Sequence, residues 1–290
     1  MLITVFTPTY NRAHLLSRLY DSLCKQTYVD FEWIIVDDGS KDNTEEVVRD
    51  FINLQKIKIQ YFKQENGGKH RAINRGVKEA KGELFFIADS DDMLPVNALE
   101  NVSRTYEDIK DDNAFAGVCG LDGTFEGKVI GSGLPKDIID STSIAVRFKL
   151  GITGDMKEVF RTEVLKEFPF PEIKGECFCP EALVWNRIAT KYKLRFFNQI
   201  IYLAEYQNDG ITAGIVRARM KSPLASMMTY AEMAYNKDVP IIARLKAAIN
   251  YWRFRLCSDS KKKPKLSWWY HCTMPLGYLI HLLDKLKVES

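Results

Sequence analysis

The chain has 290 residues, of which 46% are hydrophobic and 27% charged, a composition typical of a globular protein with a sizeable core. Its net charge of +3 is too small to indicate nucleic-acid binding, and we expect no nucleic acid among its partners. The N-terminus MLITVFTPTYNR lacks the basic segment of a signal peptide, and no apolar run reaches the roughly 18 residues that cross a bilayer.

Strand and helix signals alternate over the first hundred residues. Apolar runs predict strands at 2–6, 32–37, 57–62 and 83–88, and amphipathic patterns predict helices after Asn11, from about 43, and over 68–82. We expect Asn11 to cap the first helix and Gly82 to end the third. Repeated strand–helix–strand units favour an α/β fold with a mostly parallel sheet flanked by helices.

The pattern is less regular after residue 112 and becomes wholly helical after Gly210. We expect strands at 114–120 and 194–206, a helix at 180–192, and then helices at about 215–236, 240–256 and 274–287. We therefore divide the chain into the first half of an α/β domain (1–112), its second half (113–212) and a C-terminal helical extension (213–290).

Three polar segments follow predicted strands: TPTYNR the first, DDGS the second and DSDD the fourth. Because the carboxyl ends of parallel strands meet at one edge, where such sheets bind ligands, we expect these segments to lie together. Asp89, Asp91 and Asp92 would repel one another, and Mg²⁺ or Mn²⁺ held with a substrate diphosphate would supply the counter-charge. The alternative is a solvated acidic loop, with Asp92 near the start of the next helix.

NGGKHR (66–71) places a glycine pair before a helix, with Lys69 and Arg71 in the first turn. Helix N-termini attract phosphate through free N–H groups and the helix dipole. The segment lacks the spacing of a Walker A loop, and the first strand is not followed by G-x-G-x-x-G. The second absence argues against an NAD enzyme.

Three blocks occur in order: VFTPTYNRAHLLSRLYDSLCKQTYVDFEWIIVDDGSKDNT, NGGKHRAINRGVKEAKGE and FIADSDDMLP. Together they resemble the N-terminal half of family 2 glycosyltransferases of the GT-A fold, of the bacterial surface-polysaccharide type. The resemblance is strong over about 1–95 and moderate over about 155–212. It implies inverting transfer of a sugar from a nucleotide-diphosphate donor, by family habit a UDP-sugar, to a saccharide or lipid-linked saccharide in polysaccharide biosynthesis.

The resemblance also implies the site residues. Nine residues match positions that bind the nucleotide-sugar in the family: Thr7, Pro8, Tyr10, Arg12, Asp38, Lys69, Arg71, Asp89 and Ser90. Among them, Asp38 is placed to accept a hydrogen bond from the nucleobase. The D-x-D motif falls on Asp89 and Asp91, with Asp92 adjoining. These three would hold Mn²⁺ or Mg²⁺, with Asp91 as the direct ligand.

Inversion needs a carboxylate that takes the proton of the acceptor hydroxyl. The family places it in a Glu-Asp pair at the start of a helix, and the matching segment is GECFCPEALVWNRIA. Glu181 aligns with the Glu but is followed by Ala182. We take Glu181 as the first candidate base and Glu176 as the second. The alternative is that Glu181 only stabilises its helix, and Trp185 can either stack on a sugar or belong to the core.

The segment EYQNDGIT (205–212) resembles one that closes over the donor, through Tyr206, Asn208 and Asp209. Two other functions remain open. A sugar nucleotidyltransferase shares a related sheet, but usually has a glycine-rich basic loop where this chain has TPTYNR. The missing Asp after Glu181 leaves a catalytically inactive sugar- or nucleotide-binding protein as the other alternative.

The C-terminal segment KKKPKLSWWYHCTMPLGYLIHLLDKLK combines basic residues, Trp268, Trp269 and a leucine-rich helix. Such a combination is drawn to anionic membranes, so we expect this tail to dock on the cytoplasmic membrane face. The alternative is packing on the catalytic domain or in a dimer, and the oligomeric state stays open. The six scattered cysteines lack zinc-site spacing. We expect reduced thiols in a cytoplasmic protein, peripheral on the inner face of the membrane if the tail docks there.

Overall fold

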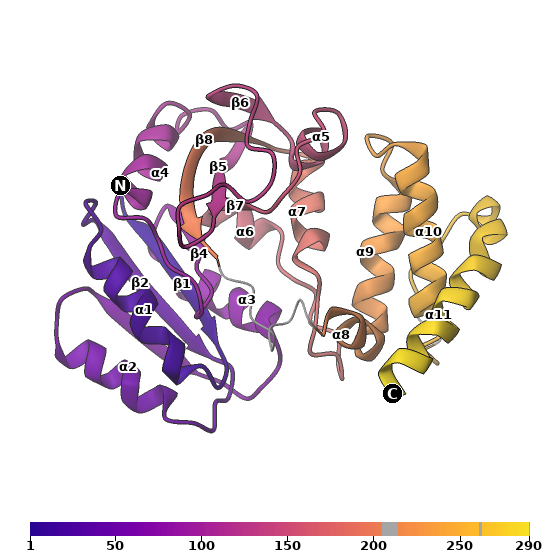
Figure 1. Cartoon of the computed structure of the whole chain (residues 1–290), viewed down its shortest axis with the longest axis horizontal. Coiled ribbons are helices and arrows are strands. Elements are labelled where there is room, and N and C mark those ends of the chain that lie inside the picture. The colour runs from indigo at the N-terminus through magenta and orange to yellow at the C-terminus, as the bar shows by residue number, and fades with distance from the viewer. Residues whose placement is uncertain (205–213, 261–262, 290) are drawn as a thin grey trace. The chain divides into compact units, whose positions relative to one another are not determined.

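The computed structural model describes residues 1–204, 214–260 and 263–289, and Figure 1 shows the course of the chain. Two compact units are present: residues 1–169 with 188–205, and residues 170–187 with 206–290. The first unit contains the sheet, and the second is built from helices. The predicted three-part division of the chain stays a prediction, because these units are distinguished by compactness and not by function.

The first unit is organised around an eight-stranded sheet of order β3-β2-β1-β4-β7-β5-β8-β6. Strands β3, β2, β1 and β4 are parallel, as are β5 and β8, whereas β7 and β6 run antiparallel to their neighbours. The strands are β1 (Ile3–Thr9), β2 (Phe31–Asp37), β3 (Ile59–Lys63), β4 (Leu84–Ile87), β5 (Phe115–Gly123), β6 (Ile138–Ser141), β7 (Met156–Arg161) and β8 (Lys193–Leu203). The expected α/β fold with a mostly parallel sheet is confirmed.

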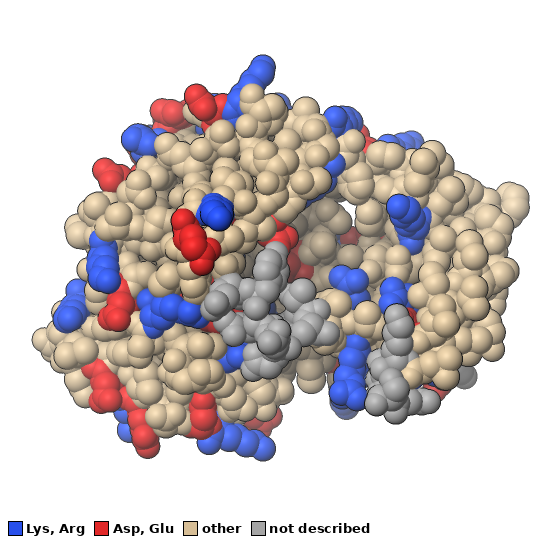
Figure 2. All heavy atoms as spheres, viewed as in Figure 1, with Lys and Arg blue, Asp and Glu red and all other residues tan. Residues whose placement is uncertain are grey.

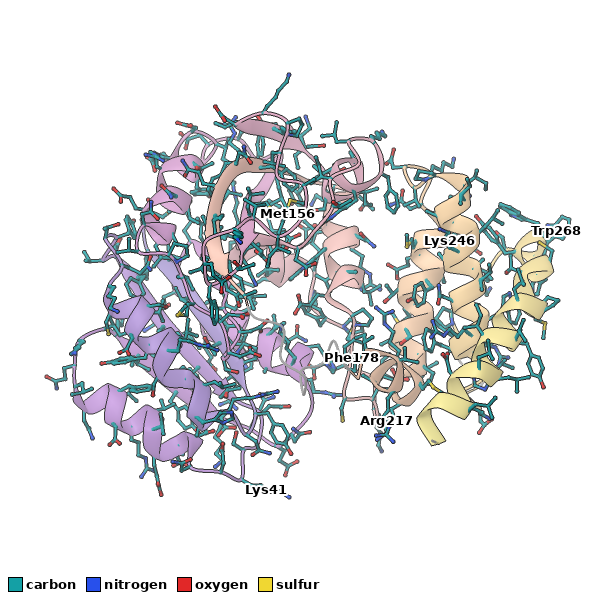
Figure 3. The ribbon with its side chains drawn as sticks, viewed as in Figure 1. Lys41, Met156, Phe178, Arg217, Lys246 and Trp268 are labelled. Carbon is teal, nitrogen blue, oxygen red and sulfur yellow. The ribbon has the colours of Figure 1, made fainter. Side chains whose placement is uncertain are left out.

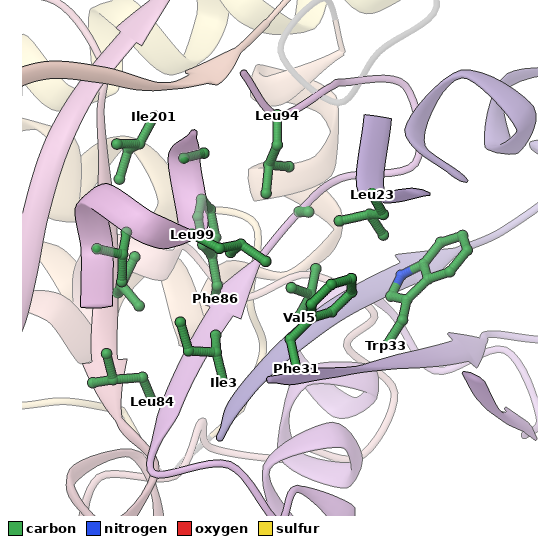
Figure 4. Close-up of a cluster of buried hydrophobic side chains, with 14 of the residues drawn as sticks. Ile3, Val5, Leu23, Phe31, Trp33, Leu84, Phe86, Leu94, Leu99 and Ile201 are labelled. Atoms are coloured by element: carbon green, nitrogen blue, oxygen red, sulfur yellow. The ribbon is translucent and has the colours of Figure 1, made fainter. Parts of the chain in front are cut away.

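Helices cover both faces of this sheet (Figure 1). They are α1 (Ala13–Cys24), α2 (Thr44–Asn53), α3 (Lys69–Glu79), α4 (Ala98–Glu107), α5 (Ser143–Phe148) and α6 (Thr162–Glu167). Residues of β1 alternate between the two faces: Ile3 and Val5 pack with side chains of α1, α2 and α4 (Figure 4). On the other face, α3 approaches Phe6 so closely that a Cβ on Gly76 would lie 2.2 Å from the ring. The strands between these layers are therefore buried on both sides.

The start of α1 differs from the prediction. Asn11 does not cap it, because this residue adopts a φ of 52° and its side chain accepts from the backbone N–H of Lys41. The helix begins at Ala13, whose N–H donates to Asp42 Oδ2 at 3.1 Å. The cap comes from the loop after β2, a long-range contact that local sequence cannot reveal.

Two other predicted boundaries are corrected. Helix α3 ends at Glu79, and the N–H of Gly82 instead donates to Thr4 Oγ1 at 2.9 Å. The helix expected over 215–236 is two helices, α8 (Ile215–Lys221) and α9 (Pro223–Tyr235). The break is at Ser222, because Pro223 cannot donate the backbone hydrogen bond that would continue α8. Between residues 138 and 167 the structure has β6, α5, β7 and α6, which were not predicted.

The second unit contains α8, α9, α10 (Ile241–Arg255), the 3-10 helix η1 (Trp268–Thr273) and α11 (Met274–Glu289). Small buried clusters, such as Met227 with Tyr251 and Phe254, hold α9 and α10 together. Helix α7 (Glu181–Ala189) begins in this unit. Its Arg187 forms a bidentate ion pair with Glu232 of α9, in which Nε and Nη2 donate to the two carboxylate oxygens at 2.8 and 2.6 Å. No helix within the described ranges combines the length and apolar character needed to cross a membrane.

Candidate functional site

The strand order reverses between β1 and β4. From β1 the chain adds β2 and then β3 on one side, whereas β4 pairs with the other side of β1. In open parallel sheets, ligands bind outside the carboxyl ends of the strands at such a reversal. Register aligns Thr9 with Asp37 and Phe6 with Ile87, so TPTYNR, DDGS and DSDD emerge at the same edge. The predicted convergence of the three polar segments is confirmed.

The DDGS segment fixes the glycine loop that precedes α3. The carboxylate of Asp38 accepts from the N–H groups of Gly67 and Gly68, at 3.0 and 2.7 Å, and from Gln64 Nε2 at 2.8 Å. Only 4% of Asp38 is exposed. The contact between Asp38 and a nucleobase stays a prediction; in this structure the carboxylate of Asp38 positions Gly67 and Gly68.

Lys69, the first residue of α3, reaches the segment after β4. Its Nζ lies 2.7 and 2.9 Å from the two carboxylate oxygens of Asp89, and both side chains are about one-third exposed. Burial would raise the pKa of Asp89, but the charges of Lys69 and Lys157 and the hydrogen bond from Lys69 outweigh it and lower the pKa. Arg71, also predicted as a site residue, is half-buried and donates to the carbonyl of Gly67. Asp89 is thus an ionised acceptor beside a basic helix start.

The next two carboxylates lie in different surroundings. Asp91 is half-buried, and burial together with the charge of Asp89 raises its pKa. Its backbone carbonyl accepts from Arg18 of α1 at 2.5 Å, which holds the segment against the sheet edge. Asp92 is 7% exposed, and burial and the charge of Asp89 raise its pKa to about 7. Ser90 between them is buried.

Tyr202 of β8 organises this segment, although sequence analysis did not single it out. Its Oη accepts from the N–H of Asp89 and donates to Asp92 Oδ2, both at 2.7 Å. The ammonium of Lys157 lies 3.4 Å from the centre of the Tyr202 ring. Asp92 therefore does not cap α4, whose N-cap is Asn97. Only the pairing of distant strands reveals this role, because Tyr202 lies in an ordinary apolar run of the sequence.

Asp122, near the end of β5, was also missed. Strand β5 runs in the same direction as β4, so Asp122 approaches the same edge of the sheet. It is 5% exposed, and its Oδ1 has no hydrogen-bond partner within the described part of the chain. Burial raises the pKa of Asp122 to about 6. The positive charge of Lys157 lowers this pKa, whereas the negative charges of Asp155 and Asp89 raise it. No motif signal marks a single Asp in a strand.

Residues of TPTYNR divide by exposure. Thr7 and Pro8 are buried, and Thr7 Oγ1 accepts from the indole of Trp33 at 2.9 Å. The expected contact of Thr7 and Pro8 with the nucleotide stays a prediction. Tyr10 is 44% exposed and Arg12 is half-buried, and these two side chains of the segment can meet a ligand.

The acidic residues fit a metal shared with substrate. Within the described residues, no three His, Cys, Asp or Glu side chains are grouped to hold a metal ion by themselves. Asp89 and Asp91 remain as partly exposed carboxylates, whereas Asp92 is engaged with Tyr202. Mg²⁺ is commonly held by one or two carboxylates plus substrate phosphates, and Mn²⁺ uses the same oxygen donors. The donor set suits such a cation, which Asp89 and Asp91 would hold.

The two candidate bases belong to the second unit. Glu176 is 6% exposed, and its carboxylate accepts from the N–H groups of Leu224 and Ala225, at 2.7 and 2.9 Å. It therefore caps the N-terminus of α9, a structural role that weakens its case as a base. Glu181 is the first residue of α7 and is partly exposed. Trp185 packs edge-on against Phe170, with 5.6 Å between ring centres.

Three further residues named from the sequence, Tyr206, Asn208 and Asp209, lie outside the described residues.

Known proteins are similar to this chain over most of its length. The model of glycosyl transferase family 2 matches residues 4–140. Glycosyltransferase GlyG of Streptococcus pneumoniae serotype 4 is 30% identical over 221 residues, which cover 72% of both chains. The GalNAc(5)-diNAcBac-PP-undecaprenol beta-1,3-glucosyltransferase of Campylobacter jejuni subsp. jejuni is 29% identical over 221 residues, 73% of this chain and 67% of its own.

A solved structure shares the fold. Staphylococcus aureus TarS 1-349 in complex with UDP-GlcNAc superposes with a TM-score of 0.62 and 19% identity, covering 88% of this chain and 73% of that one. The full-length TarS, a poly(ribitol-phosphate) beta-N-acetylglucosaminyltransferase, is 27% identical over 179 residues, which are 30% of its length. Taken with the ordered motifs at the sheet edge and the extent of the match to GlyG, these similarities establish that the chain belongs to glycosyl transferase family 2.

Proposed function

We propose that this protein transfers a sugar, with inversion, from a nucleotide-diphosphate sugar to a saccharide or lipid-linked saccharide acceptor in polysaccharide biosynthesis. The observation that carries the proposal is the meeting of Lys69, Asp89 and Asp91 at the reversal between β1 and β4. A basic helix start beside two carboxylates suits a diphosphate and its cation. UDP is our proposed nucleotide, because UDP-GlcNAc is the ligand in the TarS complex.

On the donor side, we assign the nucleotide to the half-exposed side chains Tyr10, Arg12, Lys69 and Arg71. Asp38 holds Gly67 and Gly68 in front of α3, and we keep it as the proposed acceptor from the base. We assign Mn²⁺ or Mg²⁺ to Asp91 and Asp89, where the cation would neutralise the charge that grows on the diphosphate. Lys69 would then exchange its contact with Asp89 for one with the donor phosphates.

On the acceptor side, Glu181 is our proposed general base. Its carboxylate takes the proton of the acceptor hydroxyl as the oxygen attacks the anomeric carbon and the bond from that carbon to the diphosphate breaks. The products are the glycosylated acceptor and the nucleoside diphosphate. Glu176 is less suited to this step, because both of its oxygens accept from backbone N–H groups of α9. We propose that the enzyme works in the cytoplasm, where nucleotide-sugars are made.

Thermal melting of the full chain tests the donor site. UDP with Mn²⁺ should raise the melting temperature, since a ligand at about 100 times its Kd stabilises by about 2.7 kcal/mol, and GDP or dTDP should raise it less. Asp91→Asn should melt normally without ligand and lose the increment due to Mn²⁺. The matched control is Asp111→Asn, an exposed carboxylate away from this edge. Equal increments in Asp91→Asn and the wild type would refute the metal assignment.

Release of UDP from UDP-sugars with a crude acceptor then separates an enzyme from an inactive binding protein. Glu181→Gln should keep the melting increment with UDP and lose about 10²–10⁴-fold in kcat. A wild type that binds UDP but releases none from any donor would favour the inactive binding protein. Full activity in Glu181→Gln would place the base elsewhere.

A further inference from the structure

Helix α11 presents its leucines to the outside. Its exposed face is formed by Leu276, Tyr278, Leu279, Leu282, Leu283 and Leu286, which are 40–67% exposed. Within residues 274–286 the one exposed charged side chain is Lys285, which lies two turns after Tyr278 at the margin of this face. A surface helix ordinarily turns its apolar stripe toward the core and its polar side toward water. In α11 the arrangement is reversed.

The inner side of α11 explains this reversal, because polar contacts anchor it to α10. Asp284 is 7% exposed, and its carboxylate accepts from both Nε and Nη2 of Arg253, the latter at 2.8 Å. His281 is 3% exposed, with Nδ1 at 3.0 Å from the carbonyl of Arg253. Gly277 allows close approach, since a Cβ there would lie 2.4 Å from Trp252 Cβ. These contacts fix the rotation of α11, so its leucines cannot turn inward.

Aromatic and basic groups flank the leucine face. Trp268, in η1 just before α11, is 83% exposed and points outward in Figure 3. Toward the other end of α11 lies Lys285, which is exposed, while Arg255, the last residue of α10, and Lys263 are partly exposed. Burial and the charge of Arg255 lower the pKa of Lys263, and the charge of Asp259 opposes this shift. In the view of Figure 2, the atoms over α11 are largely neither acidic nor basic.

We propose that this face of α11 docks on the surface of an anionic lipid bilayer. An apolar helix face with an exposed Trp at one end and Lys and Arg beside it is the pattern of helices that lie in the membrane interface. The leucines enter the acyl boundary, Trp268 sits at the headgroups, and the basic groups meet anionic lipid. This charge complementarity favours a lipid surface over a second copy of the chain, whose face would bring the same positive groups. The proposal does not depend on the catalytic assignment.

Sedimentation of the full chain with vesicles tests it. The wild type should bind vesicles that contain phosphatidylglycerol, bind pure phosphatidylcholine more weakly, and be released from the former by salt. The triple variant Leu279→Gln/Leu283→Gln/Leu286→Gln should bind about a hundredfold more weakly, since each half-exposed leucine contributes about fivefold. Lys285→Gln should lose about fivefold on anionic vesicles and nothing on neutral ones.

The matched control replaces three exposed apolar residues of the first unit: Val29→Gln/Leu54→Gln/Leu150→Gln, at positions that are 82%, 56% and 46% exposed. It should bind like the wild type, and both triple variants should keep the wild-type melting temperature and UDP release. A wild type that does not bind anionic vesicles, or a leucine variant that binds equally well, would overturn the proposal. The proposal would also be overturned if the wild type were a dimer that binds no vesicles and the leucine variant were a monomer, because the face would then join two copies of the chain.

Discussion

Asp122 offers a quantitative test of the electrostatics at the sheet edge, through Asp122→Asn. The side chain is 5% exposed, and burial raises its pKa to about 6 from an ordinary value of 3.8. Because the folded state binds the proton more tightly, the contribution of Asp122 to stability is fully present below pH 4. It is lost as the pH rises toward and through about 6. The difference in pKa corresponds to a loss of about 3 kcal/mol above pH 6.

Asparagine resembles the protonated side chain at every pH, so this dependence should vanish in Asp122→Asn. Relative to the wild type, the variant should gain about 3 kcal/mol of unfolding free energy between pH 4 and pH 7.5, or about 6–12 °C in melting temperature for a unit of this size. The assay is urea unfolding of the full chain in EDTA, without nucleotide, at several pH values.

The control for this test is Asp137→Asn, which removes an exposed carboxylate from the same unit. Asp92 and Glu158, whose pKa values burial raises to about 7, are present in all three proteins. Because the charge of Asp122 also raises the pKa of Glu158, its removal lowers that pKa and adds to the stability gained at high pH. A difference between Asp122→Asn and the wild type that is flat with pH, or that falls as pH rises, would refute the reasoning. If the stabilised variant also loses activity, the buried charge is kept for function.

Two other substitutions test roles that the structure assigns. Glu176→Gln should lower the unfolding free energy of the second unit by about 1–2 kcal/mol, because the N–H groups of Leu224 and Ala225 lose a charged acceptor. The variant should keep its activity at low temperature. A loss of kcat with unchanged stability would instead identify Glu176 as the base. Tyr202→Phe should cost about 2–3 kcal/mol in urea unfolding and raise the pKa of Asp92 above 7 by NMR titration, since the hydrogen bond from Tyr202 lowers that pKa. An unchanged pKa of Asp92 would contradict the assigned hydrogen bond.

Sequence reasoning succeeded where the signal is local or follows from topology. Apolar runs such as FEWIIVD predict buried strands, and repeated strand–helix–strand units lead to a parallel sheet whose carboxyl ends share one edge. For that reason the topology alone places TPTYNR, DDGS and DSDD together. Lys69 and Asp89 were each predicted as site residues, and the structure shows that they pair.

It failed where the partner of a residue is distant in the chain. Asp42 rather than Asn11 satisfies the start of α1, and Tyr202 reaches Asp89 and Asp92 from more than a hundred residues away. The sequence ranked Glu181 before Glu176 as the candidate base, and only packing shows that the carboxylate of Glu176 accepts from the N-terminus of α9. Hydrogen bonds of this kind depend on which elements become neighbours, and residue type and spacing do not encode that.

The amino-acid sequence by itself determined the α/β fold, the family, and the edge of the sheet where the acidic and basic segments meet. Periodicity and ordered motifs carry that information, because they arise from backbone geometry and local chemistry. Tertiary structure decided the role of each carboxylate: Asp89 is paired with Lys69, Asp92 is held by Tyr202, and Asp122 is buried. It also decided that the leucines of α11 face outward, because polar contacts between Asp284 and Arg253 fix the rotation of that helix.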